Sequence, residues 1–245
     1  GSNISINVEF DESVYVTGNP RIKLEIDNAT GSIDRYANYS SGNSSSVLNF
    51  IYTVVDGDNS THLHYTSTSS LSANSGTIRD NSSNDATLTL PSPGSSGSLG
   101  DNKTIVIDAR APIALLIACA KATGATGGGP NCDEINTSGS VTIQSTEIGT
   151  AYIVNVTYVT TVENLTDITG ANDGRSCDFS GAPRTCLMKS VDITDVTAEY
   201  TIQLSGMNDK TYRVYAVDAS GNLSGHSTGT GGESGALGTF TVKFD

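Results

Sequence analysis

Acidic residues are the most abundant charged side chains in this chain of 245 residues, where 26 Asp and Glu stand against 13 Lys and Arg. Several lie among turn-forming residues, as in the run Asp56-Gly57-Asp58-Asn59. Carboxylate oxygens in loops are the ligands that hard cations such as calcium prefer. Acids also favour turns through their own hydrogen bonds and keep a surface hydrated. The acids therefore indicate either a cation site or ordinary polar turns.

Charge and the distribution of apolar residues argue against two classes of partner, nucleic acid and membrane. The net charge of -13 argues against nucleic acid, because a phosphate backbone needs a basic surface to neutralise it. The sequence also lacks a run of about twenty apolar residues, so we expect no membrane insertion within this stretch of chain.

Patterns typical of enzymes are weak. His62 and His64 would share one face of a strand, with His226 as a third metal ligand, but no acidic or cysteine partner stands at a telling spacing. Half-exposed histidines without a metal are therefore the preferred interpretation. No Gly-x-Ser-x-Gly elbow is present, and the glycine run at 126–130 lacks the Lys and Ser/Thr of a phosphate-binding loop. We predict that the chain is not an enzyme.

All four cysteines fall in the second half of the chain: Cys119, Cys132, Cys177 and Cys186. Four cysteines can form two disulfides in three ways, and all three connectivities are open. Pairing of sequence neighbours would close the loops 119–132 and 177–186 by disulfides, with free thiols or a metal site as alternatives. A zinc site would need closer cysteine pairs or nearby histidines. Loops closed by disulfides would present a rigid binding surface.

Residue periodicity predicts an all-β fold. Between Arg21 and Asp27, three aliphatic residues alternate with four charged ones, so one face is buried and the other suits an edge strand. The apolar run within 111–122 follows a proline, and we interpret it as a buried strand rather than a helix. The same alternation predicts strands at 48–54, 200–204, 212–216 and 240–244.

Composition and order favour two β modules. Ser, Thr, Asn and Gly are abundant and charged residues make up only 16%, which suits short strands joined by polar turns. The segment Ile107–Pro112 is the expected joint, because the strand pattern restarts after it. We therefore expect tandem β-sandwich domains at residues 1–108 and 109–245.

Short strings recur in order along the first half of the chain: Val8–Gly18, Asn49–Val54, Asp56–Asn59, Gly76–Asp80, Asn84–Leu90 and Ile105–Asp108. Together they resemble repeat modules of large bacterial cell-surface adhesins. In the second half, Gly149–Asn155, Asp167–Ala171 and Tyr215–Ser224 resemble another bacterial Ig-like module. The order of the strings carries the resemblance, since the run from Asp218 to Asn222 is also a good hairpin turn. The cysteine-bearing segments depart from a plain spacer repeat.

The resemblance implies two tandem Ig-like or cadherin-like sandwiches in a non-catalytic, extracellular stalk or tip segment at the cell surface. Its partners would be neighbouring repeats of the same chain. It also implies calcium at the joint between modules, where carboxylates from both sides share one ion. The candidate ligands are Asp108 in the joint and five acids in predicted loops: Asp56, Asp58, Asp80, Asp85 and Asp218.

A binding module is the alternative function. The loops 119–132 and 177–186 would then recognise a glycan or protein on a host or neighbouring cell, with Asn131, Asp178 and Phe179 as candidate contacts. A glycan site usually presents an exposed aromatic side chain, and Phe179 is the only aromatic residue in either loop. This scarcity favours the spacer.

Overall fold

The computed structural model describes residues 1–28, 31–120, 135–136, 138–156, 162, 168, 188–207, 209–225 and 239–243. Contacts divide the chain into two compact units, Gly1–Arg110 (unit 1) and Ala111–Asp245 (unit 2). This division lies close to the boundary expected after residue 108.

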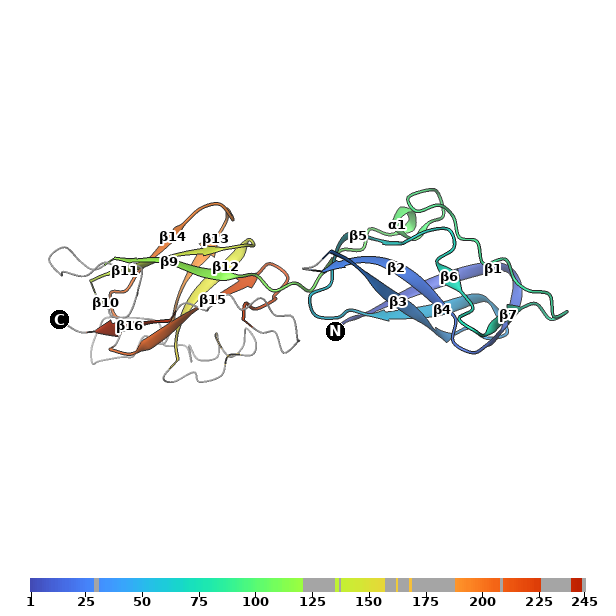
Figure 1. Ribbon diagram of the computed structural model, residues 1–245, viewed down its shortest axis with the longest axis horizontal. Coiled ribbons are helices and arrows are strands. Elements are labelled where there is room, and N and C mark those ends of the chain that lie inside the picture. Colours follow the sequence, from blue (N-terminus) through green and yellow to red (C-terminus); the bar gives the residue numbers. More distant parts are fainter. Residues whose placement is uncertain are drawn as a thin grey trace. The chain divides into compact units, whose positions relative to one another are not determined.

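Unit 1 is built on one curled sheet of eight strands, all paired antiparallel (Figure 1). Its elements are β1 (Asn3–Thr17), β2 (Arg21–Asn28), β3 (Gly31–Ser41), β4 (Ser45–Thr53), β5 (Asn59–Tyr65), β6 (Leu71–Ser72), β7 (Thr77–Arg79), the short helix α1 (Leu99–Asn102) and β8 (Ile107–Asp108). The strand order is β7-β1-β4-β3-β2-β5-β8, and β6 pairs with β2.

A single long strand explains why unit 1 has one sheet where the sequence predicts a sandwich of two. β1 pairs with β4 from Asn3 to Glu9, and its register shifts before Val14. Beyond the shift, Tyr15–Thr17 pair with β7 instead. A strand that changes partner at an irregularity of this kind turns a corner and joins two layers into one sheet.

The alternation predicted for β2 is confirmed. Ile22, Leu24 and Ile26 are buried in the core of unit 1, while the charged residues between them face solvent. The expectation of an edge strand is wrong, because β2 lies between β3 and β5. Charges on β2 are tolerated in the interior of the sheet since one face of an antiparallel sheet can be solvated.

Unit 2 contains two smaller sheets (Figure 1). Its strands are β9 (Ala114–Ala120), β10 (Ile135–Asn136), β11 (Ser140–Ser145), β12 (Gly149–Asn155), β13 (Met188–Ile193), β14 (Tyr200–Gln203), β15 (Thr211–Asp218) and β16 (Thr239–Lys243). One sheet has the order β10-β16-β15-β12-β13 and the other β14-β11-β9. Val141 and Ile143 of the second sheet share a buried core with Ile153 and Val214 of the first.

The run within 111–122 forms a strand, as predicted, but most of it is not buried. In β9 only Ala114 is buried, while Leu115 and Ile117 are exposed. β9 lies at the edge of the β14-β11-β9 sheet, so it has a covering neighbour on one side only. The all-β fold class is confirmed, whereas the described strands form one curled sheet in unit 1 and two sheets in unit 2.

Both ends of unit 1 emerge at the same end of its sheet. The backbone N–H of Val54 donates to the carbonyl of Ser2 (2.9 Å), just before β1. Three residues later, the N–H of Gly57 donates to the carbonyl of Ala109 (2.7 Å), just after β8. The turn between β4 and β5 therefore holds the start and the end of unit 1 beside each other.

The described ends of unit 2 emerge at opposite ends. The chain enters beside the β11–β12 turn, where the N–H of Thr146 donates to the carbonyl of Ile113 (3.2 Å). Gly149 and Asp218 are register partners at this entry end. In β16, Thr241 pairs with Thr211, the first residue of β15, so the strand leads away from the entry end.

Candidate functional site

Three candidate calcium ligands lie where the chain leaves unit 1. Asp108, on β8, is the register partner of Asn59. The N–H of Ala109 donates to the carbonyl of Asp58 (2.9 Å), so the turn that carries Asp56 and Asp58 lies beside Asp108. Asp56 is exposed and Asp58 is buried. The acids predicted near the joint therefore share one end of unit 1 but not one environment.

The carboxylate of Asp58 is already occupied by protein donors. Arg35 donates from Nε and Nη2 to Oδ1 (2.9 and 2.8 Å), and the Tyr52 hydroxyl and the Val55 N–H donate to Oδ2. The hydrogen bond to Asp58 raises the pKa of Arg35, and burial followed by the same carboxylate raises the pKa of Tyr52. This arrangement satisfies a buried charge inside unit 1 and leaves it little capacity to bind a cation.

Asp80 closes the turn that follows β7. Its Oδ1 accepts from the N–H groups of Ser82 (2.7 Å) and Asn84 (2.8 Å), and its Oδ2 accepts from the Asn84 side-chain amide (2.6 Å). These bonds, led by the one to the Asn84 side chain, lower the pKa of Asp80. The carboxylate acts as an acceptor for the backbone of its own turn, a usual role for Asp in turns.

Asp218 makes the same turn after β15 in unit 2. Its Oδ1 accepts from the N–H groups of Ser220 and Asn222, and its Oδ2 from the Asn222 side chain, each at 2.8 Å. In both turns the residue before Asn has positive φ, 70° at Ser83 and 89° at Gly221. The spacing Asp-x-x-x-Asn therefore forms one turn type in both units, which we call the Asp turn.

Asp85 has an exposed partner. Its carboxylate lies 2.6 Å from Nε of Arg79, and both side chains are well exposed. An ion pair of this kind in solvent contributes little to stability. Asp85 therefore belongs to the surface next to the Asp turn of unit 1.

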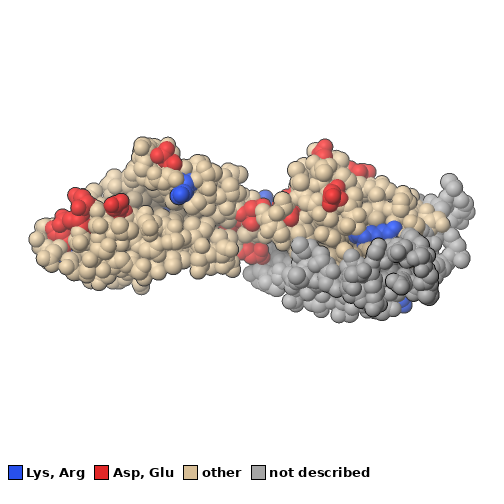
Figure 2. All heavy atoms as spheres, turned by 180° about the vertical axis from the view of Figure 1, so that it is seen from behind, with Lys and Arg blue, Asp and Glu red and all other residues tan. Residues whose placement is uncertain are grey.

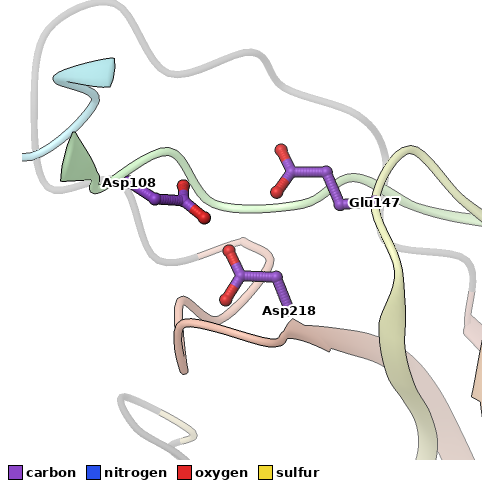
Figure 3. A group of neighbouring side chains, drawn as sticks. All are labelled: Asp108, Glu147 and Asp218. Atoms are coloured by element: carbon purple, nitrogen blue, oxygen red, sulfur yellow. The ribbon is translucent and has the colours of Figure 1, made fainter. Parts of the chain in front are cut away.

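The Asp turn of unit 2 has a second carboxylate beside it. Glu147, in the β11–β12 turn, and Asp218 have carboxylate oxygens within 4.8 Å of each other. Their side chains project from two turns toward the same space; Figure 3 draws them with Asp108, the candidate ligand of unit 1. Glu147 was not among the calcium ligands predicted from the sequence. The sequence pattern that could have identified it is an acidic residue in a short connection between two segments of alternating apolar and polar residues.

The chemistry of this pair fits part of a calcium shell. A carboxylate offers about four acceptor positions, and the protein donors occupy two on Oδ1 of Asp218 and one on Oδ2. By this count one acceptor position on Oδ2 is left for a further ligand such as a cation. Calcium takes about six to eight oxygen ligands, so Glu147 and Asp218 would supply a minority of them and other oxygens the rest.

The other acids give no complete site within one unit. Among the described residues of either unit taken alone, no group of three or more Asp, Glu, His or Cys side chains brings its ligand atoms together closely enough to surround an ion. The Glu147–Asp218 pair is therefore the arrangement that best fits the predicted calcium role, and it includes one of the six predicted residues.

Most of the predicted loop site falls outside the described residues. This holds for Cys132, Cys177 and Cys186, and for the candidate contacts Asn131, Asp178 and Phe179. Cys119 is described; it lies in β9, half-exposed, and packs against the core of unit 2. The pairing of the cysteines stays a prediction.

His62 and His64 lie side by side on β5, with ring centroids 4.6 Å apart. Nε2 of His62 is 2.8 Å from the carbonyl oxygen of Gly100 in α1. A Cβ added to Gly100 would come within 2.0 Å of the His64 ring, so α1 packs directly on this pair. The contacts are those of a helix docked on a strand.

Charge is sparse on the face of the described residues that Figure 2 shows. In the view of Figure 2, acidic side chains form small separate groups and uncharged residues cover most of the described area. In the part of the chain that is described, no helix has the length and apolar character needed to cross a bilayer.

Comparisons with protein families, curated proteins and solved structures give no match. A function for this chain has to be argued from its residues and their geometry.

Proposed function

We propose that the chain is a non-catalytic, extracellular segment of a bacterial surface adhesin. In this proposal unit 2 is a spacer link, and unit 1 is the module that it displays to contribute to adhesion. The observation that carries the proposal is the position at which the chain enters and leaves each unit. A spacer must pass the chain from one end to the other, as unit 2 does. Unit 1 receives and releases the chain at one end, which suits a displayed module.

The modular relation between the units supports tandem repeats. Each unit has its own buried core, and each carries an Asp turn directly after a strand, β7 in unit 1 and β15 in unit 2. For unit 2, the shared core of its two sheets also supports an Ig-like sandwich. For unit 1, the strand that changes partner supports a sandwich whose two layers have become continuous.

The proposal includes calcium at the entry end of unit 2. Glu147 and Asp218 are its ligands there. Asp108 stands three positions before Ala111, the first residue of unit 2, so the chain itself keeps this carboxylate within a few residues of the entry end. An ion bound by acids from both sides of the linker would restrict its bending.

A domain-exchange experiment tests the division of labour. The chain is displayed on a non-adherent cell, and binding to host or neighbouring cells is counted. Replacing unit 2 by an unrelated spacer of similar length should preserve attachment, and deleting unit 1 should abolish it. Attachment that survives loss of unit 1 but not of unit 2 would overturn the proposal. That result would favour the alternative in which the loops 119–132 and 177–186 bind a glycan or protein.

Calcium is tested by thermal unfolding with millimolar calcium and with chelator. At an affinity typical of extracellular calcium modules, about 10⁻⁴–10⁻³ M, saturating calcium should stabilise the chain by about 1–3 kcal/mol. Glu147→Gln and Asp218→Asn should abolish this gain, and Asp108→Asn should reduce it.

The two Asp turns provide a matched control. Asp80→Asn makes the same change in the same turn of unit 1, where the described residues provide no neighbouring acid cluster. Both Asn variants will lose some stability from the turn, but only Asp218→Asn should lose the response to calcium. An equal response in the two variants would remove the ion from the proposal.

A further inference from the structure

A polar cleft of about 360 Å³ lies on the outer face of unit 1. It is lined by Arg21 and Lys23 of β2 and by Tyr36 of β3; the hydroxyl-bearing residues of the segment 66–72, which we call the hydroxyl wall, complete the lining. The volume lies within the range of small-ligand sites, about 300–1,000 Å³. The lining is mostly polar, so an apolar ligand would find little to contact.

Sheet register brings these residues together. Lys23 is the direct partner of Tyr36, and Arg21 is the direct partner of Ser72. The N–H of Lys23 donates to the carbonyl of Ser70 (3.0 Å), so the segment 66–72 lies along β2. Because Ile22 points into the core, its neighbours on β2 point outward into the cleft.

Arg21 is oriented but not neutralised. Its guanidinium carbon lies 4.0 Å from the centroid of the Tyr36 ring, a cation–π contact that restrains the position of the group. No hydrogen bond or ion pair joins this guanidinium to another described residue. Its five N–H donors are therefore held at the edge of the cleft for solvent or for an acceptor on a ligand.

Lys23 differs from Arg21 in having an acid of its own. Its Nζ lies 2.6 Å from Oδ1 of Asp34, and this contact raises the pKa of Lys23. Lys23 and Asp34 balance each other, so the unbalanced charge at the cleft is that of Arg21. The chain as a whole has a net charge of -13, whereas Arg21 places a local positive charge beside this cleft.

The hydroxyl wall is ordered by its own hydrogen bonds. Ser70 is 5% exposed, and its Oγ lies 2.8 Å from Oγ1 of Thr66 and accepts from the N–H of Ser67 (2.9 Å). Oγ of Ser67 lies 3.0 Å from Oγ of Ser69, which is exposed. Hydroxyls both donate and accept, which is what the hydroxyls of a sugar require of a binding site.

We propose that this cleft binds an acidic saccharide. The anionic group of the sugar, a carboxylate or sulfate ester, pairs with the fork of Arg21, and the sugar hydroxyls bind the segment 66–72. A guanidinium binds planar anions through two parallel hydrogen bonds, which gives both charge and direction. The inference rests on unit 1 alone and does not depend on calcium or on the function proposed for unit 2.

The test is an NMR titration of the isotope-labelled 245-residue chain with D-glucuronate, D-glucose and inorganic sulfate at constant ionic strength. Glucuronate has a carboxylate that glucose lacks, so comparing the two measures the contribution of the negative charge to binding. Sulfate is an anion without a sugar, so comparing it with glucuronate measures the contribution of the sugar. Glucuronate should shift the amides of residues 66–72 and the Nε–H of Arg21 saturably. Glucose should bind much more weakly, and sulfate should bind more weakly than glucuronate.

Substitutions test whether the cleft residues bind glucuronate. Arg21→Gln should weaken the affinity for glucuronate about ten-fold or more, because the variant loses a charge-assisted hydrogen bond. Arg79→Gln is the matched control, because Arg79 is another exposed arginine of unit 1 outside the cleft, and it should leave affinity unchanged. Ser69→Ala removes an exposed hydroxyl with little risk to folding and should weaken binding roughly three-fold.

Three results would overturn the proposal. The first is no saturable shift with glucuronate at tens of millimolar. The second is sulfate matching glucuronate at the same amides, which would reduce the cleft to a simple anion site. The third is Arg21→Gln binding as tightly as wild type while its thermal unfolding stays normal.

Discussion

The buried carboxylate of Asp58 supports a quantitative prediction about unit 1. Asp58→Ala would leave the Tyr52 hydroxyl and the Val55 N–H without their acceptor and would remove both bonds from Arg35. An unsatisfied buried polar group costs about 1–3 kcal/mol. Breaking a buried ion pair costs about 3–5 kcal/mol in all. The Arg35 side chain is 27% exposed, so water will hydrate part of its guanidinium group. The loss of folding stability should therefore fall toward the lower half of that range.

The assay is differential scanning calorimetry of the full chain. Because each unit has its own core, we expect two transitions. Asp58→Ala should lower the transition of unit 1 by more than about 10 °C, since 1 kcal/mol shifts a domain of this size by about 4 °C or more. The transition of unit 2 should stay where it is.

Asp85→Ala is the control, because it removes the same charge from an exposed ion pair. Its partner Arg79 and Asp85 itself have side chains that are 46% and 75% exposed, so the loss should stay below about 1 kcal/mol. The reasoning is refuted if the two variants are equally stable. Movement of both transitions by Asp58→Ala would refute the independence of the units.

Three further predictions concern turns and cysteines. Gly42→Ala should destabilise unit 1 by about 2 kcal/mol or more in urea unfolding, because φ is 106° and a Cβ would lie 2.1 Å from a backbone oxygen; Gly57→Ala, at φ 85° with open space, should cost about 1 kcal/mol. The lowered pKa of Asp80 means that its turn is fully stabilised above the unfolded value of about 3.9 and loses this stability as pH falls through the folded value. The Asn84 amide should report that loss by NMR, and a flat response would contradict it. Peptide mapping without reduction should find the four cysteines paired as sequence neighbours; crossed pairs would disprove that pairing.

Strands were predictable where the signal is local. The alternation in β2 follows from the two-residue period of a strand, so Ile22, Leu24 and Ile26 could be assigned to the core without knowing their neighbours. The position of β2 within the sheet depends on which strands pair beside it. Its charged face is equally compatible with an edge strand and with an inner strand solvated on one side, so the sequence alone could not distinguish them.

Features that depend on register were not predictable. In β1 the register shifts between Glu9 and Val14 and the partner changes after Val14, and no glycine or proline in this stretch marks either event. Glu147 meets Asp218 because Gly149 pairs with Asp218 across two strands, and no local pattern contains that pairing. The Asp turn is the intermediate case: its spacing was visible from Asp218 to Asn222, but the sequence did not distinguish a capping carboxylate from a metal ligand.

The common end at which the chain enters and leaves unit 1 determines how this unit would respond to mechanical force. A pull applied through Ser2 and Ala109 acts on one end of the sheet, where the turn between β4 and β5 holds both segments. Hydrogen bonds loaded from one end break in succession, so each resists alone and unit 1 would unzip under tension. In unit 2 the pull would run along the strands from Ala114 toward Lys243, and many bonds would share it. Unit 2 is therefore the part suited to bear load, and unit 1 keeps its fold best when force does not pass through it.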